Sequence, residues 1–290
     1  MLDLVAQSVL SGIGVGAIYG LIGIGFCVIY NASGIVNFAQ GAFVMLGGML
    51  THAGITRLGL PLPLAAVGAV ALVALSGIAL ELVVVRPLWN RGSTMFVMIL
   101  ATLASQIVVE RVTLILAGDQ PRTLPVFTDL PPIRIFDFVV NFQFLWILGC
   151  SAVVILGLTS FFSSTTTGKA MRACSINRDA AALQGIPVSR VLALAFALSA
   201  GLGAVAGILI TPTQYTAFNV GVPFAISGFI AAIVGGFGRP LGAFAGGILL
   251  GVAQALAIVL LGAAFKNVAA LSILLLFLFV RPTGLLGPAK

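Results

Sequence analysis

Hydrophobic positions along this chain form long runs that contain no charged residue. Residues 4–56 hold no Asp, Glu, Lys or Arg, which is enough for two membrane segments of about 20 residues and a connection. The later runs predict further segments at about 62–85, 94–117, 142–162, 188–211, 223–237, 241–261 and 267–281. The pattern therefore predicts about nine segments, within a range of about eight to ten because the run at 223–237 is short and rich in glycine.

The runs are continuous and do not alternate between apolar and polar positions, which disfavours a transmembrane β-barrel. Hydrophobic residues make up 60% of the chain and charged residues 7%, and the mean hydropathy is +1.22. No hydrophilic segment is long enough for a second, soluble domain. We predict an all-α fold, a polytopic transmembrane helical bundle that forms one domain over residues 1–290.

Lys and Arg are distributed unequally between the two sets of connections. The first set has nine, a bias that places this side in the cytoplasm together with the C-terminus. Its cations are Arg86, Arg91, Lys169, Arg172, Arg178, Arg190, Arg239, Arg281 and Lys290. The second set has four, namely Arg57, Arg122, Arg134 and Lys266. An odd number of segments then places the N-terminus outside. The net charge of +7 is spread over these loops, so it indicates membrane orientation and no nucleic-acid partner.

The polar and basic stretch at 163–190 lies between two long apolar runs. Its composition is helical, with room for about two turns before Gly185 and Pro187 end them. A membrane protein that keeps a short helix outside the bilayer has a reason to present it to something in water. We therefore predict a cytoplasmic loop that a separate soluble partner contacts.

The connection at 31–41 is polar, uncharged and flanked by glycine. Such a break is tolerated at membrane depth where the backbone faces protein or a water-filled cavity, and broken helices supply solute contacts in transporters. Asn31, Asn37 and Gln40 are therefore candidates for the translocation path. An ordinary cytoplasmic turn between the first two segments explains the same residues about equally well.

Glycines recur every four residues in several runs: Gly12, Gly16 and Gly20, then the pairs Gly203 and Gly207, Gly242 and Gly246, Gly247 and Gly251. Small residues at this spacing let helix backbones approach closely within a membrane. We expect most of them to serve helix packing, within the bundle or with a second subunit, and fewer to line a solute path.

The chain offers little for catalysis. Thr167-Gly168-Lys169-Ala170 resembles the end of a nucleotide-binding loop, but it lacks the first glycine and the Ser or Thr that holds magnesium. The only histidine is His52, and the three cysteines show no metal-ligand spacing. We expect no enzyme activity, no cofactor and no metal site in this chain, so an ATPase, if one is needed, is another chain.

Several segments together resemble the permease subunits of the branched-chain amino acid ABC importer family, specifically the shorter of its two paired permeases. The resemblance runs nearly from end to end. It comprises IVNFAQGAFVMLG at 35–47, Glu81, RPL at 86–88, GKAMRA at 168–173, AAALQGI at 180–186, AAIVGGFG at 231–238 and PTGLLG at 282–287. Each piece alone is weak, whereas their order and spacing are specific.

This resemblance implies an ATP-driven importer of branched-chain amino acids or a related small polar solute. Its other parts are a second permease, two cytoplasmic ABC ATPases that bind ATP, and a periplasmic or surface solute-binding protein. The chain is then a multi-pass protein of the bacterial inner membrane, surrounded by membrane lipid. Many ABC importers carry Glu-Ala-Ala, three residues and Gly in a coupling loop, and Asp179-Ala-Ala181 followed by Gly185 is similar. The implied ATPase-coupling residues are Arg172, Asn177, Arg178, Asp179, Ala180, Ala181 and Gly185.

Two other classes stay open. A channel or facilitator for a small polar solute such as urea or an amide fits the hydropathy but does not need the basic stretch at 163–190. An ion-coupled carrier usually places acidic residues in the middle of a segment. Here only Glu81 and Glu110 come near that position, and both lie toward segment ends.

Overall fold

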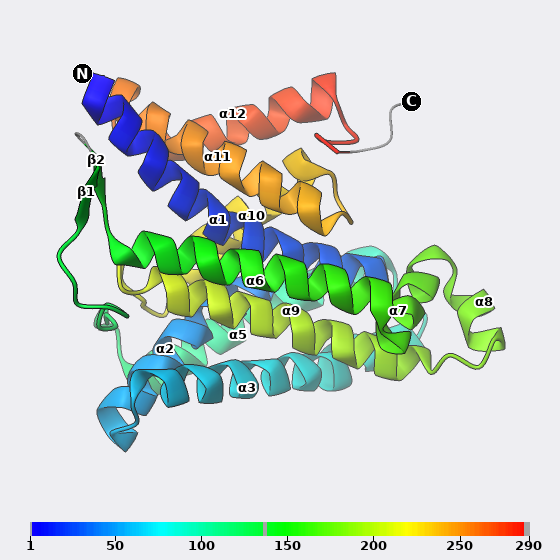
Figure 1. The fold of residues 1–290 in the computed structure, drawn as a ribbon. Coiled ribbons are helices and arrows are strands. Elements are labelled where there is room, and N and C mark those ends of the chain that lie inside the picture. The colour runs from blue at the N-terminus through cyan, green and yellow to red at the C-terminus, as the bar shows by residue number, and fades with distance from the viewer. Residues whose placement is uncertain (1, 136–137, 287–290) are drawn as a thin grey trace.

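The computed structural model describes residues 2–135 and 138–286, and for residues 2, 3, 134, 135, 138 and 179 it describes the backbone only. Helices account for nearly all of its regular structure (Figure 1). The longer helices are α1 (Leu2–Ser33), α2 (Gln40–Leu58), α3 (Leu62–Leu80), α5 (Met95–Ala117), α6 (Phe142–Ser164), α7 (Thr166–Ile176), α9 (Val188–Ile210), α10 (Gly221–Gly235), α11 (Pro240–Leu261) and α12 (Phe265–Val280). The short helices are a π-helix, η1 (Glu81–Val85), with α4 (Arg86–Asn90) and α8 (Arg178–Leu183).

Every segment predicted from the hydrophobic runs is a helix in the structure, so the polytopic helical bundle is confirmed. Among the described residues, six helical stretches are long and apolar enough to cross a membrane. Helix α10 has 15 residues, about 22 Å, and is as short as its run predicted. One boundary differs: α1 continues to Ser33, so the break between the first two helices is at 34–39 and not at Asn31.

Helix α1 forms the centre of the bundle. Over its most apolar stretch 89% of its residues are buried, whereas the corresponding value for α5 and for α6 is 17%. Figure 1 shows α1 passing behind α6, with α11 and α12 on one side of it and α9 and α3 on the other. The peripheral helices therefore leave most of their apolar side chains on the outside, as expected for a protein surrounded by lipid.

Glycines bring α11 against α1. A Cβ atom on Gly16 would lie 2.6 Å from the carbonyl oxygen of Gly247, and one on Gly247 would lie 2.5 Å from the Cα atom of Gly20. Real Cβ atoms do not approach other atoms this closely, so the two backbones touch only because these positions lack side chains. The glycine spacing in the sequence therefore marks helix packing inside this chain.

The other glycine pairs also face neighbouring helices of the same chain. Gly203 and Gly207 on α9 lie against α2, at Phe43 and Val44, and Gly242 on α11 lies against Gly235 on α10. At each of these positions a Cβ atom would collide with backbone or Cβ atoms of the neighbouring helix. The packing interpretation thus holds for all the glycine pairs that the sequence singled out.

Helix α3 passes into a π-helical turn and then into α4 without a loop. Pro87 lies in the first turn of α4 and has no N–H to continue the regular hydrogen-bond pattern, which favours a local irregularity just before it. Inside this turn the fully buried Glu81 pairs with Arg86, Nη2 to Oε2, at 2.9 Å. This pairing uses the Glu81 carboxylate within the fold, which argues against a role as the ion-binding group of an ion-coupled carrier.

The long connection between α5 and α6 contains a small hairpin that the sequence did not predict. Strands β1 (Ile133–Ile135) and β2 (Phe138–Val140) pair antiparallel. The Gln7 side chain donates to the Val139 carbonyl and accepts from its N–H. An isolated bridge joins Arg122 to Thr216. These bonds fasten the connection between α5 and α6 to α1 and to the segment before α10.

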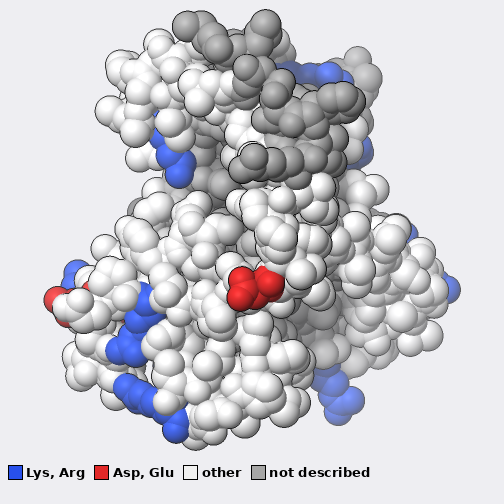
Figure 2. Space-filling view, turned by 60° about the vertical axis from the view of Figure 1, so that its left-hand side comes forward, with Lys and Arg blue, Asp and Glu red and all other residues white. Residues whose placement is uncertain are grey.

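The two sets of cations lie at opposite ends of the bundle, as the sequence predicted. Helices α7 and α8, which carry Lys169, Arg172 and Arg178, lie at one end of the bundle, whereas the hairpin and the start of α1 lie at the other (Figure 1). Helix α4, with Arg86, adjoins α8 through the contact of Arg178 with Trp89. The end of α2, which carries Arg57, lies at the hairpin end. Figure 2, with the hairpin side turned forward, shows broad uncharged surfaces between scattered charged side chains. Residues 287–290, with Lys290, lie outside the described residues.

The close contact of α1 with α11 predicts a strong effect of one added side chain. Replacing Gly247 by Val forces the two backbones apart, so we expect a loss of about 1–3 kcal/mol or more. Thermal unfolding of the purified protein, followed by size-exclusion chromatography, should show a lower midpoint. Gly149→Val on α6 is the control, since nothing lies within 4 Å of its Cβ position. Equal midpoints for the two variants would contradict this account of the packing.

Candidate functional site

The break between α1 and α2 lies inside the protein. Ile35, Asn37 and Ala39 are each at most 3% exposed, although the segment that carries them is neither helix nor strand. Backbone groups that are buried without secondary structure need partners from elsewhere. The Phe38 N–H finds its partner on α5, and the N–H groups of Ile35 and Ala39 find theirs on the side chains of Ser33 and Asn37. The break is therefore a buried element and not an ordinary turn in water.

Helix α5 supplies partners on one side. The Phe38 N–H donates to Thr102 Oγ1 at 3.2 Å, and the Ala42 N–H, in the first turn of α2, donates to Gln106 Oε1 at 2.5 Å. Gln106 Nε2 in turn donates to Glu110 Oε1 at 2.7 Å. Thr102, Gln106 and Glu110 follow each other every four residues on one face of α5. This polar stripe is visible in the sequence, and our sequence interpretation missed Thr102 and Gln106.

Helix α9 bonds to the start of α2 and to α1 on the other side. The Ser199 hydroxyl lies 2.6 Å from Gln40 Oε1 and 2.9 Å from the Gly25 carbonyl oxygen, and Gln40 Nε2 donates to the Ser199 carbonyl at 3.1 Å. Gln40 and Ser199 are both fully buried. This cluster joins α1, α2 and α9 at one point. We name the residues Gly25, Gln40 and Ser199 the three-helix cluster.

The structure does not bring the three candidate path residues together. Asn31 Nδ2 donates to the Gly238 carbonyl at 2.7 Å, at the end of α1. Asn37 Oδ1 accepts from the Ala39 N–H at 3.1 Å, and its Nδ2 has no partner among the described atoms. Gln40 belongs to the three-helix cluster, where it holds helices together. A role for Asn31, Asn37 and Gln40 in translocation stays a prediction.

The start of α2 meets the start of α10. A Cβ atom on Gly221 would lie 2.5 Å from the Gly41 carbonyl oxygen and 3.0 Å from Gln106 Nε2. Two helices thus begin beside the same glutamine, within the bundle. Helix N-termini carry partial positive charge, and Gln106 Oε1 offsets part of it at α2. The break, α5 and α10 therefore form one connected polar region.

The predicted coupling segment consists of two short helices instead of one. The sequence predicted one short helix that ends at Gly185, but the structure has α7 up to Ile176, where the extended conformation of Asn177 ends it. The Asn177 side chain then caps α8 by accepting from the Ala180 N–H at 3.0 Å. Gly185, with φ +80°, turns the chain toward α9. Asn177 ends α7 and also caps α8, which explains why the segment has two helices where the sequence predicted one.

Exposure within this segment also differs from the expectation. Ala180 and Ala182 are exposed, whereas Ala181 is 4% exposed and packs in the hydrophobic core. The two large apolar side chains Ile176 and Leu183 are 87% and 88% exposed. Ala181 is therefore not part of the outer surface of this chain. The sequence interpretation missed Ile176 and Leu183, although they are apolar residues in an otherwise polar stretch.

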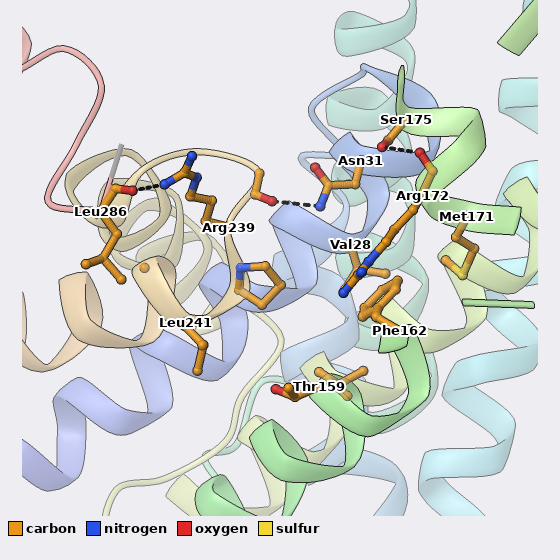
Figure 3. A pocket seen from close by; sticks show the side chains of 14 residues that line it. Val28, Asn31, Thr159, Phe162, Met171, Arg172, Ser175, Arg239, Leu241 and Leu286 are labelled. Carbon is orange, nitrogen blue, oxygen red and sulfur yellow. Dashed lines mark hydrogen bonds between the residues drawn. The ribbon is translucent and has the colours of Figure 1, made fainter. Parts of the chain in front are cut away.

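The two arginines of the segment point in different directions. The Arg178 guanidinium lies over the Trp89 ring, 4.3 Å from its centroid, and so connects α8 to α4. Arg172 extends from α7 toward α1 and α6 (Figure 3). The side chain of Asp179, the remaining charged candidate, lies outside the described residues. Arg178 therefore packs against the membrane helices, although we had expected it to face a partner.

Helix α4 is in turn fixed to the start of α9. Arg86 binds Glu81 through Nε and Nη2, and Nη2 also lies 3.3 Å from the Ser189 carbonyl oxygen. The contacts therefore form a continuous series from α8 through Trp89 and Arg86 to α9. Helix α9 carries Ser199 of the three-helix cluster. This series joins the exposed segment to the buried break.

Comparison with known proteins agrees with this architecture. Residues 8–280 match the profile of a family described as "Branched-chain amino acid transport system / permease component". The high-affinity branched-chain amino acid transport system permease protein BraD of Pseudomonas aeruginosa is 33% identical, over 97% of this chain and 95% of its own. The corresponding LivH protein of Escherichia coli is 31% identical, with the same coverage. PsaBC from Streptococcus pneumoniae has a similar fold, with a TM-score of 0.53 and 14% identity over 96% of this chain and 92% of that one.

The three-helix cluster predicts a measurable loss when one hydroxyl is removed. Ser199→Ala leaves Gln40 Oε1 and the Gly25 carbonyl without this donor, and an unsatisfied buried group costs about 1–3 kcal/mol. We expect a lower thermal midpoint of the purified protein. Ser151→Ala is the control, because Ser151 is equally buried but bonds only to Ile147 of its own helix. If both variants unfold at the same temperature, the cluster does not hold the helices together.

Proposed function

The chain belongs to the branched-chain amino acid transport system permease family, and we propose that it is one permease subunit of an ATP-driven importer for branched-chain amino acids or a related small polar solute. In this proposal a second permease subunit completes the membrane pathway. Two cytoplasmic ATPase subunits bind and hydrolyse ATP, and a periplasmic or surface binding protein delivers the solute. The similarity over nearly the whole chain supports this proposal more strongly than a channel or facilitator.

The proposed orientation places α7 and α8 in the cytoplasm of a bacterial cell, with the chain in the inner membrane. The support is the separation of the cations to the two ends of the bundle, since loops rich in Lys and Arg stay in the cytoplasm. The start of α1 and the hairpin then face the outside. This orientation brings the α7–α8 segment to the side on which ATP is available.

The proposed contact surface for the ATPase is centred on Ile176 and Leu183. Exposed apolar side chains of this size in a water-facing segment mark an interaction site, and this is the observation that carries the proposal. Each ends a short helix, with Asn177 between the two helices. Ala180 and Ala182 lie between them in the sequence, and their small side chains leave room for the ATPase to approach the backbone of α8 closely. This revises the docking surface inferred from the sequence, which had included Ala181.

Movement of this surface has a route into the membrane. Arg178 stacks on Trp89, Arg86 ties the same region to Ser189, and α9 leads to the three-helix cluster. A shift of α8 on ATP binding would therefore move α4 and α9 and change the packing around the break. In this proposal the solute passes beside that break, between this chain and the second permease.

The contact surface predicts that two charges abolish coupling. In the reconstituted importer, Ile176→Asp together with Leu183→Asp should lower solute-stimulated ATP hydrolysis by about tenfold or more. The reason is that each apolar side chain buried in an interface contributes about 1.5–3 kcal/mol. The amount of permease in the membrane should stay the same, because neither side chain packs in this chain.

Leu58→Asp is the matched control, because Leu58 is 72% exposed but lies at the other end of the bundle. Its stimulation should equal that of the unchanged protein. Normal stimulation in the double variant would show that this surface is not where the ATPase binds.

The orientation predicts the labelling of introduced cysteines in intact cells. Cysteine at Ser164, which is exposed beside α7, should be protected from a membrane-impermeant maleimide, whereas cysteine at Gln120 in the outer connection should react. Burial raises the pKa of the Cys174 thiol, which lowers its thiolate fraction near neutral pH and keeps the background on this side small. Labelling of position 164 but not of 120 would reverse the orientation.

A further inference from the structure

A cavity of about 550 Å³ lies at the end of the bundle where α7 is found (Figure 3). Its floor is Val28 and Asn31 near the end of α1. One wall comes from α6, with Leu158 and Phe162, and the opposite wall comes from the start of α11, with Leu241. Helix α7 closes the top. The cavity therefore lies between two membrane helices, at the level where they end.

The walls of this cavity are apolar and continuous with the outer surface of the bundle. Leu241 is 54% exposed at the rim, and Leu156, one turn away from the wall on α6, is 69% exposed. In a membrane, these side chains face hydrocarbon. An occupant of the cavity can therefore extend from it along the surface between α6 and α11 without leaving an apolar environment.

The top of the cavity is cationic. Figure 3 shows Arg172 extending from α7 along the wall and ending beside Val28 and Phe162. Its guanidinium has no hydrogen bond or ion pair among the described residues, and none of the lining residues is acidic. Arg239 is exposed at the far side, where it donates to the Leu286 carbonyl. Arg172 is exposed, so its guanidinium is accessible to an anionic partner that enters the cavity beside the apolar walls.

We propose that this cavity binds one anionic phospholipid of the cytoplasmic leaflet. The phosphate would lie against Arg172, with Arg239 nearby, and an acyl chain would occupy the apolar space between α6 and α11. Basic pockets between membrane helices on the cytoplasmic side bind anionic headgroups in this way. The assignment to this leaflet rests on the orientation in the proposed function.

The lining favours an anionic lipid over other occupants. A zwitterionic headgroup brings an ammonium group, for which the cavity offers no carboxylate. A free phosphate would satisfy Arg172 but leave the apolar walls without an occupant. A peptide would have to bury polar backbone against those walls. Only a molecule with a compact anion at one end and hydrocarbon at the other matches the whole surface.

Binding there would act on the coupling segment. Arg172 belongs to α7, and Ser175, also in the lining, lies two residues before Asn177, where α7 ends. A lipid that pairs with Arg172 would hold α7 against α1 and α6, while α8 keeps its separate contact with Trp89. Anionic lipid would thus stabilise the position from which α8 meets the ATPase.

The test uses the complete transporter in nanodiscs and two photoactivatable lipids that carry a diazirine in the acyl chain. One probe has a phosphatidylglycerol headgroup and the other a phosphatidylcholine headgroup. Mass spectrometry should locate cross-links on the peptides with Leu158 and Leu241, in excess for phosphatidylglycerol. Arg172→Gln should reduce this excess about fivefold, the contribution of one cation near the membrane surface.

Three controls make the result specific. Arg91→Gln removes an exposed arginine at the same end of the bundle but outside this cavity, and should keep the excess. Thr159→Trp fills the cavity without changing its charge, and should reduce cross-links from both probes. Inorganic phosphate at millimolar concentration should not displace the phosphatidylglycerol probe.

The proposal is overturned if the unchanged protein shows no headgroup preference, or if Arg172→Gln and Arg91→Gln give the same ratio. Displacement by inorganic phosphate would instead identify a site for a free anion. Cross-linking does not depend on ATP hydrolysis or transport. A failure of the coupling surface at Ile176 and Leu183 is therefore distinguishable from a failure of the lipid site.

Discussion

The arrangement of this protein depends on how closely other helices approach α1. Lipid offers no hydrophobic force that would drive one apolar helix against another, so association comes from close van der Waals packing and from hydrogen bonds between helices. Gly16 and Gly247 permit that close packing on the side of α11. Because α1 is enclosed on most sides, its direction fixes where α9, α10 and α11 can lie. The position of the break at its end follows from the same packing.

A second constraint is that buried backbone groups need partners. The segment 34–39 has no secondary structure, and its N–H groups find side chains on α5 and nearby, namely Thr102 for Phe38 and Asn37 for Ala39. In the first turn of α2, the Ala42 N–H donates to Gln106. The side chain of Gln40, the first residue of α2, accepts a hydrogen bond from Ser199. A break of this kind is expensive unless every partner is in place. The side chains on α5 and α9 hold the break and the start of α2 in place. Their own positions are in turn determined by these bonds.

Sequence and structure agree where the physical signal is local and repeated. Charge-free runs identified the membrane helices, and the four-residue glycine spacing identified their close contacts. The polar stripe of Thr102 and Gln106 was also readable, but its partner, the break, is about 64 residues away in the chain. Sequence spacing alone cannot pair two such distant segments.

The coupling segment shows the same limit at short range. Its composition predicted a helix. Whether the segment forms one helix or two depends on the conformation of Asn177, which composition does not reveal. Likewise, neither the burial of Ala181 nor the stacking of Arg178 on Trp89 follows from composition. The stacking depends on how α8 lies against α4, and the burial of Ala181 depends on how α8 packs against its neighbours in the bundle. A sequence pattern fixes which residues are available, and the tertiary contacts decide which of them stay exposed.

At the end of the bundle with α7 and α8, the two arginines have separate tasks. Arg178 holds α8 to α4 by stacking on Trp89, and Arg172 lies in the cavity of α1, α6 and α11 (Figure 3). Between them, Asn177 interrupts the helix. The segment is thus held to α4 through Arg178, whereas Arg172 extends toward the other side of the bundle and Ile176 and Leu183 stay outside. In the proposed importer, a force on those two side chains would reach α4 through the contact of Arg178 with Trp89. The contact of Arg86 with Ser189 would carry it on to α9, so the segment would act on the membrane helices and not hang from them as a loose connection.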